Sequence, residues 1–204
     1  TNKVLKNTYL LLSMTLLFSA VTAGISMTMN VPHFGLLTLV GYFALLFLTA
    51  KFRDSSLGIL FVFMLTGFMG LTLGPILNAY MATANGGQLI MTALGGTGAV
   101  FLSLSGYVLA SRKDFSFMGG FLMVGILVAF LAGLGAFFFS MPILSLAVSG
   151  MFFLWMSGMI LYQASEIIHG GETNYIMATV SLYISIYNLF LSLLHILGAL
   201  SGDD

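Results

Sequence analysis

Residues 175–199 read YIMATVSLYISIYNLFLSLLHILGA, a run without a single Asp, Glu, Lys or Arg. A helix needs about 20 mostly apolar residues to cross the hydrocarbon core of a bilayer, so this segment is long enough to span a membrane. The rest of the chain has the same character, since 59% of its 204 residues are apolar, 6% are charged and the mean hydropathy is +1.09. Soluble domains carry about 25% charged residues. The composition therefore excludes a water-soluble domain.

Six further apolar runs of similar character precede this segment, separated by short breaks rich in Gly, Pro, Asn or charge. The predicted spans cover residues 9–29, 34–50, 57–80, 87–110, 117–139, 143–168 and 175–199. Continuous runs of this length are typical of helices, whereas the strands of membrane barrels alternate over about 10 residues. We therefore predict an all-α membrane protein with seven transmembrane helices, organised as a single domain over residues 1–204.

Basic residues mark one side of the membrane. They form three pairs, which are Lys3 with Lys6, Lys51 with Arg53, and Arg112 with Lys113. The pairs lie at the N-terminus, after span two and after span four, and the positive-inside rule places that side in the cytoplasm. We predict an inner-membrane protein with a cytoplasmic N-terminus and a periplasmic C-terminus. Because residue 1 is Thr and not Met, we also expect a short tail upstream of it.

Several kinds of chemistry are excluded by composition and spacing. The chain has no Cys, and its six basic and six acidic residues include no basic run, which argues against thiol chemistry and nucleic-acid binding. No Ser has a base partner at a recognisable spacing. His169 and Glu172 resemble half of a metal site, but without a third ligand they are better explained as solvated loop residues. We predict no enzymatic activity, no cofactor and no metal.

Polar side chains form a stripe along residues 175–199. Their spacing of four, three, four and three residues aligns them on one helix face, and they are Ser181, Ser185, Asn188, Ser192 and His195. In lipid such a face must contact other helices or a wet cavity. Two interpretations are therefore open, namely hydrogen bonds between helices and the wall of a polar pathway. The histidine is correspondingly either a hydrogen-bonded bundle residue or a proton relay.

A second group of polar residues lies near the inner end of the predicted span 143–168. Gln163 and Glu166 are three residues apart and share a helix face. Glu166 is the one acidic residue within a predicted span. It either reaches cytoplasmic water or lines a cavity open to the cytoplasm, where it could hold a proton or a cation.

Four strings occur in order along the chain: TLGPILN at residues 72–78, RKDFSFMGG at 112–120, IIHGGETNY at 167–175 and LYISIYNLFL at 182–191. Together they resemble the Bax inhibitor-1 family of seven-span membrane proteins, and most closely its bacterial YccA-like branch. The resemblance runs through nearly the whole chain. It implies a central seventh helix surrounded by the other six.

The resemblance also implies two functions. Family members that leak calcium in a pH-dependent way use a pair of aspartates, and the matching positions here are Gln163 and Ser185, so that Glu166 is the nearest carboxylate. The YccA-like branch is associated with the membrane-anchored protease FtsH, which it modulates. We therefore expect a modulator of membrane-protein quality control, with the lipid bilayer and the FtsH protease complex as partners. The alternative is a pH-sensitive cation leak channel.

Overall fold

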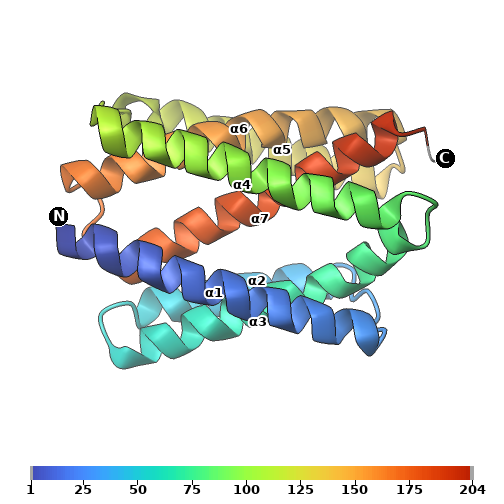
Figure 1. The fold of residues 1–204 in the computed structure, drawn as a ribbon, viewed down its shortest axis with the longest axis horizontal. Helices are drawn as coiled ribbons and strands as arrows, with labels where there is room; N and C mark the ends of the chain where they lie inside the picture. The colour runs from blue at the N-terminus through green and yellow to red at the C-terminus, as the bar shows by residue number, and fades with distance from the viewer. Residues whose placement is uncertain (1, 203–204) are drawn as a thin grey trace. The chain divides into compact units, whose positions relative to one another are not determined.

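The computed structural model describes residues 2–202, and this part of the chain is helical throughout, without strands. The helices are α1 (Asn2–Thr28), α2 (Leu37–Lys51), α3 (Ser56–Met81), α4 (Gly86–Ser111), the 3-10 helix η1 (Ser116–Met118), α5 (Gly119–Phe138), α6 (Pro142–His169) and α7 (Tyr175–Leu200). Figure 1 shows them along the chain. The predicted all-helical class is confirmed, and the seven α-helices agree with the predicted number of spans.

The helices differ from the predicted spans mainly at their starts. α1 is already helical at Asn2, the first described residue, well before the predicted span 9–29. α2 begins at Leu37 rather than at residue 34. Gly35 has a φ of +59°, which the right-handed helix does not accommodate, and its N–H binds His33 Nδ1 at 3.0 Å.

Within residues 2–202, six helices are long and apolar enough to cross a membrane, and α2 is a shorter apolar helix. Its 15 residues extend about 22 Å at 1.5 Å per residue. The hydrocarbon core is about 30 Å thick. If α2 crosses the membrane, the residues that flank it must therefore cover the rest of the hydrocarbon thickness.

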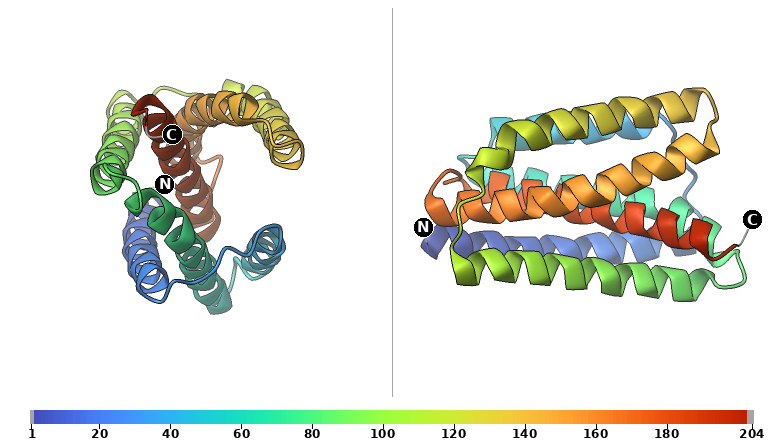
Figure 2. Two further views of the ribbon diagram at one scale, coloured as in Figure 1. Left: turned by 90° about the vertical axis from the view of Figure 1, so that its right-hand side faces the viewer. Right: turned by 90° about the horizontal axis from the view of Figure 1, so that it is seen from above.

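The helices group into two compact units. Unit 1 comprises the chain through Thr83 together with Glu172–Tyr183, and unit 2 comprises Ala84–Gly171 together with Ile184 to the C-terminal end. Unit 1 thus holds α1, α2, α3 and the first part of α7. Unit 2 holds α4, η1, α5, α6 and the remainder of α7, which is one continuous helix (Figures 1 and 2). A single domain over the whole chain stays a prediction.

In unit 1, α3 packs against both α1 and α2. Glycines on α3 permit the close approach of α1. A Cβ atom at Gly70 would overlap Thr22 Oγ1, and one at Gly74 would overlap the side chain of Ser26. Small residues at such spacing let helix backbones approach closely in lipid, which is the packing role that the sequence predicts for them.

Ser26 has a second role in the same contact. Pro75 lies inside α3 and lacks the N–H that would bind the carbonyl oxygen of Leu71, four residues earlier. The hydroxyl of Ser26 donates to that oxygen at 2.7 Å. A backbone group left free in lipid costs several kcal/mol unless a neighbour satisfies it, so Ser26 compensates for the proline from the adjacent helix.

Two asparagines form hydrogen bonds between segments at the two ends of unit 1. At one end, Asn78 Nδ2 of α3 donates to the carbonyl oxygen of Met27 at 3.1 Å. At the other end, Asn174 Nδ2 donates at 3.1 Å to the carbonyl oxygen of Arg53 and at 3.1 Å to Asp54 Oδ1. α2 therefore runs from the end marked by Asn78 to the end marked by Asn174.

The core of unit 2 forms around α6, which packs against α4 and α5. Its side chains Met156 and Ile160 form a buried cluster with Leu189 of α7. A second cluster joins Ala164 and Ile168 of α6 to Val108 of α4. Met156, Ile160, Ala164 and Ile168 recur every four residues, so one stripe of α6 packs against α4 and, at Leu189, against α7.

Candidate functional site

The two positions that the resemblance assigns to an aspartate pair are in direct contact. Ser185 of α7 donates a hydrogen bond of 3.0 Å to Gln163 Oε1 of α6. Ser185 is buried, with 2% of its surface exposed, and Gln163 is half-buried. The pair carries no charge, and neither group titrates near neutral pH. The structure thus joins a residue of the polar stripe to the second polar group predicted from the sequence.

A second polar link between the same two helices lies further along α7. His195 Nδ1 lies 2.6 Å from Ser149 Oγ of α6. Sequence reasoning missed Ser149, although a signal was present, because 14 residues separate it from Gln163 and place both on one face after about four helical turns. The contact makes His195 a hydrogen-bonded residue of the bundle.

The other members of the stripe differ in their surroundings. Asn188 Nδ2 donates to the carbonyl oxygen of Ile184 in its own helix at 2.9 Å. Ser192 is buried, and Ser181 is half-buried within the part of α7 that belongs to unit 1. The stripe as the wall of a polar pathway stays a prediction.

In unit 1, α7 makes polar contacts that the sequence analysis did not single out. Tyr183 Oη lies 2.5 Å from Ser19 Oγ and donates to the carbonyl oxygen of Thr66 at 3.3 Å. Thr179 Oγ1 donates to the carbonyl oxygen of Thr8 at 3.3 Å. Both α7 residues are buried. Tyr183 was missed because its aromatic ring places it among the apolar residue types, although it carries a hydroxyl group.

Glu166 is half-buried, and its carboxylate lies against Gly171, just beyond the end of α6. It thus extends toward the loop that follows α6. His169 and Glu172, which the sequence analysis explains as solvated loop residues, contact backbone groups. His169 Nε2 lies 2.9 Å from the carbonyl oxygen of Arg112, and Glu172 Oε1 accepts from Asn174 N at 2.9 Å. Within residues 2–202, no group of three or more potential metal ligands occurs.

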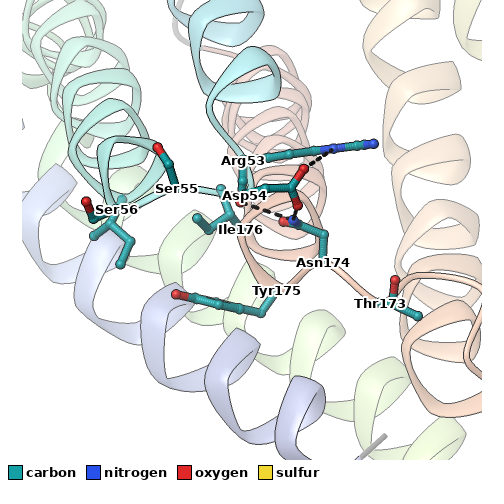
Figure 3. A pocket seen from close by; sticks show the side chains of 9 residues that line it. Arg53, Asp54, Ser55, Ser56, Thr173, Asn174, Tyr175 and Ile176 are labelled. Atoms are coloured by element: carbon teal, nitrogen blue, oxygen red, sulfur yellow. Dashed lines mark hydrogen bonds and ion pairs between the residues drawn. The ribbon is translucent and has the colours of Figure 1, made fainter.

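A pocket of about 510 Å³ opens at the Asn174 end of unit 1 (Figure 3). Arg53 and Asp54 form an exposed ion pair of 3.9 Å beside it. Asn174 Oδ1 accepts from Met177 N at 3.0 Å and so caps the start of α7. The lining residues are Arg53, Asp54, Ser55, Ser56, Ile59, Thr173, Asn174, Tyr175 and Ile176. The polar groups at its rim are paired with one another, since Asn174 caps α7 and also binds the loop at Arg53 and Asp54. These contacts explain the pocket.

Comparisons with known proteins show the family of this chain. The family described as "Inhibitor of apoptosis-promoting Bax1" matches residues 1–202. The "Modulator of FtsH protease YccA" of Escherichia coli K12 is 55% identical over 204 residues, covering 100% of this chain and 93% of the relative. The "Inner membrane protein YccA" of E. coli O6:H1 has the same identity and coverage. A protein of Pseudomonas aeruginosa is 54% identical over 202 residues, or 98% of this chain and 91% of the relative.

The helices and the relatives together define the class of protein. Six helices can cross a membrane by length and composition, and a relative that matches the full chain is named as an inner-membrane protein. The chain is therefore a multi-pass inner-membrane protein. Since the family match extends over residues 1–202 and the relatives align along nearly their whole length, this chain belongs to the Bax inhibitor-1 family.

Proposed function

We propose that this chain modulates membrane-protein quality control by binding an FtsH-type protease, and that it does so without catalytic activity. The observation that carries the proposal is the 55% identity over the full 204 residues with the E. coli modulator of FtsH protease. The match covers 100% of this chain and 93% of the relative, so the surface that the relative offers to its partner is expected to recur here.

The polar contacts of α6 and α7 support a binding role. Ser185 with Gln163 and His195 with Ser149 each use their polar atoms to join two helices. Hydrogen bonds of this kind contribute about 0.6 kcal/mol each in membrane proteins. A bundle held by several such links and by close glycine contacts resists extraction from the membrane. That property suits a slowly processed partner of an ATP-dependent protease.

The test is to overproduce the chain in cells that contain FtsH and lack their own YccA-type protein. We expect a known membrane substrate of the protease to persist longer, and the chain to co-purify with FtsH from native membranes. A matched variant, Gln163→Leu with Ser185→Ala, removes the polar pair and should keep both effects if binding carries the function. Unchanged substrate lifetimes together with no co-purification would contradict the proposal.

A cation leak is the second candidate function, and one observation favours it. Gln163 and Ser185 are paired where other family members have two aspartates, so the site's geometry is present without its charges. The polar pathway of this alternative consists of Gln163, Glu166, Ser181, Ser185, Asn188, Ser192 and His195. Here the variant Gln163→Leu with Ser185→Ala should abolish the activity, which separates the two candidates.

We further infer that α7 is the central helix. Its side chains Leu182, Leu189 and Leu194 are completely buried. In its most apolar stretch 44% of residues are buried, the same share as in α3 and more than the 17% in the corresponding stretches of α4 and α5. A helix covered on several faces is expected to be apolar with a few satisfied polar groups, and α7 has this composition.

The hydrogen bond between Asn78 and Met27 supports a seven-span topology. It holds the end of α3 next to the end of α1, so both ends lie on the same side of the membrane. The chain between them contains α2 and α3, and an even number of crossings requires α2 to cross as well. With seven spans, all three basic pairs face one side, which the positive-inside rule makes cytoplasmic. We infer a cytoplasmic N-terminus and a periplasmic C-terminus.

A further inference from the structure

The pocket beside Asn174 lies entirely within unit 1, where the connection between α2 and α3 meets the start of α7 (Figure 3). Its volume of about 510 Å³ falls within the range of about 300–1,000 Å³ that is usual for small-molecule sites. Residues between 53 and 59 line one part of it, and residues 173–176 line the other. The pocket is therefore large enough for a small ligand or for the headgroup of a lipid.

The frame of the pocket is fixed by contacts that do not involve a ligand. Asn174 Nδ2 binds the carbonyl oxygen of Arg53 and Oδ1 of Asp54, each at 3.1 Å. A Cβ atom at Gly58 would overlap the backbone of the α2–α3 connection and lie 3.0 Å from Cδ1 of Ile176. The absence of a side chain at Gly58 thus lets the start of α7 pack closely against this connection. A ligand would find the pocket already formed.

The charges of the pocket indicate what kind of ligand it can take. Of the nine described residues that line it, two are charged, and they are the oppositely charged Arg53 and Asp54. Their side chains are 53% and 86% exposed, and Nε lies 3.9 Å from Oδ2. An ion pair this exposed contributes little to stability, so both groups can turn to a ligand at small cost. A matching ligand has one negative group, one positive group and no net charge.

The chemistry of the two side chains identifies these groups. The planar guanidinium of Arg53 suits a phosphate, which it can bind through two parallel N–H donors. The carboxylate of Asp54 accepts hydrogen bonds, and a primary ammonium group donates three. A quaternary ammonium has no N–H to donate, and a headgroup with only negative charge is repelled by Asp54. The pocket therefore favours a phosphate ester linked to a primary ammonium group.

Three hydroxyl groups add to the polar lining of the pocket. They belong to Ser56, Thr173 and Tyr175. A hydroxyl can donate to a phosphate oxygen and can accept from an ammonium group. The lining thus offers polar partners to both ends of such a headgroup.

The position of the pocket favours a lipid over a soluble phosphate ester. Ile59 and Ile176 give it an apolar part. Beside it, Leu57 and Leu60 in the first turns of α3 are 46% and 53% exposed, as expected of side chains that face acyl chains. Tyrosines such as Tyr175 are enriched where a membrane meets water. The polar pocket therefore opens next to the lipid-facing surface of a membrane helix.

We propose that this pocket binds the headgroup of a zwitterionic phospholipid that carries a primary ammonium group, as phosphatidylethanolamine does. Arg53 holds the phosphate, Asp54 holds the ammonium group, and the acyl chains lie along the exposed face of α3. The site lies at the end of the short helix α2, where a bound headgroup would meet the thinner bilayer that a short span requires. Lipid binding here does not depend on the protease partner or on the pair of Gln163 and Ser185.

Native mass spectrometry of the full, unmodified chain tests the choice of lipid. The chain is offered phosphatidylethanolamine, phosphatidylcholine and phosphatidylglycerol with identical acyl chains. We expect one ethanolamine lipid to bind about tenfold more tightly than either competitor, which is the value of one hydrogen bond to a charged group. Inorganic phosphate and glycerophosphoethanolamine should not displace it. Equal binding of the three lipids would overturn the proposal, and displacement by either soluble compound would show a site for free phosphate esters instead.

Three variants assign the roles of the charged residues. Asp54→Asn keeps an oxygen that can accept from Asn174 but removes the charge, so it should abolish the preference for ethanolamine over choline. Arg53→Gln should weaken the binding of both lipids about tenfold, because each contains the phosphate. Lys51→Gln is the matched control, since it removes a positive charge just before the pocket without changing its lining. A preference that survives in Asp54→Asn, or is lost in Lys51→Gln, would contradict the assignment.

A second measurement places the lipid beside α3 in a bilayer. The chain has one Trp, so Leu60→Trp combined with Trp155→Phe gives a single fluorophore next to the pocket. Brominated ethanolamine lipid should quench it more than brominated choline lipid does, and Asp54→Asn should make the two equal. Leu102→Trp in the same background is the control, because Leu102 is 69% exposed on α4 in unit 2. The two lipids should quench the control equally. The same preference at both positions, or at neither, would overturn the site.

Discussion

Ser185 on α7 donates a hydrogen bond of 3.0 Å to Gln163 on α6, so that a hydroxyl and an amide take the place of two carboxylates. Two close carboxylates would share protons and titrate as a pair. The hydroxyl and the amide keep one hydrogen bond at every physiological pH. The hydrogen bond between Ser185 and Gln163 therefore does not depend on pH.

Calcium flux should require negative charges that the pair of Gln163 and Ser185 does not carry. Calcium sites gather several oxygen ligands that include carboxylates, so the purified chain in liposomes should show little calcium flux at neutral pH. Gln163→Asp combined with Ser185→Asp should raise the flux by more than the two single changes together, because the carboxylates act as a unit. A calcium indicator inside the vesicles measures it.

The matched control for calcium flux is Gln163→Asn combined with Ser185→Asn, which introduces side chains of the size of aspartate without charge. It should leave the flux at the level of the unmodified chain. Strong flux through the unmodified chain that is abolished by Glu166→Gln would contradict the prediction and favour the leak channel.

The hydrogen bond from Ser26 to the carbonyl oxygen of Leu71 should stabilise the bundle only because residue 75 is a proline. Ser26→Ala is expected to destabilise the bundle by about 1 kcal/mol, as the carbonyl of Leu71 loses the hydrogen bond that Ser26 donates. In the Pro75→Ala background the new N–H of residue 75 can serve that carbonyl, and the same change should cost much less. Unfolding in sodium dodecyl sulfate, followed by circular dichroism, measures the double-mutant cycle. Equal costs in both backgrounds would disprove the coupling.

Glycines at the contact between α1 and α3 should tolerate no methyl group. Gly70→Ala and Gly74→Ala place a Cβ atom against Thr22 and Ser26, and overpacking of this kind costs about 1–3 kcal/mol. Gly95 on α4 is the matched control, because nothing lies within 4 Å of its added Cβ. Gly95→Ala should be neutral or slightly stabilising, since Ala favours helix over Gly. Equal unfolding free energies for the Gly70 and Gly95 variants would contradict the packing role.

Asp114 should contribute stability that acid removes. Hydrogen bonds from Ser116 lower its pKa below the ordinary value of 3.8, so the folded chain binds this proton less tightly than the unfolded chain does. Its contribution is then complete above pH 3.8 and is lost as the pH falls through the lowered pKa. Thermal unfolding of the unmodified chain and Asp114→Asn should differ at pH 6 and converge in acid. A Tm difference that stays constant down to pH 3 would rule out this role.

Topology can be tested at the short helix α2. Alkaline phosphatase and green fluorescent protein fusions after Arg53 and after Asp114 should both report a cytoplasmic position, and fusions at the C-terminal end should report the periplasm. A fusion after His33 should be periplasmic. If the fusions after His33 and Arg53 report the same side, α2 does not cross and the inferred topology is wrong.

The sequence by itself determined the class of fold, because membrane insertion depends on local properties. The length and apolarity of runs such as residues 175–199 require helices in lipid, whatever their neighbours are. Spacing likewise placed Ser185 and His195 on one face of a helix. Helix starts were less predictable. α1 is already helical before the predicted span 9–29, and the start of α2 depends on the positive φ of Gly35.

Only the tertiary structure decided which polar groups meet. The pairing of Ser185 with Gln163, of His195 with Ser149, and of Ser26 with the carbonyl of Leu71 depends on the rotation and depth of separate helices. No local pattern specifies these, because many rotations bury similar apolar area in lipid. The two carbonyl oxygens around His169 were invisible for a further reason, since backbone groups have no letter in a sequence. The packing of α6 against the connection between α4 and α5 is what places this ring beside the carbonyl oxygen of Arg112.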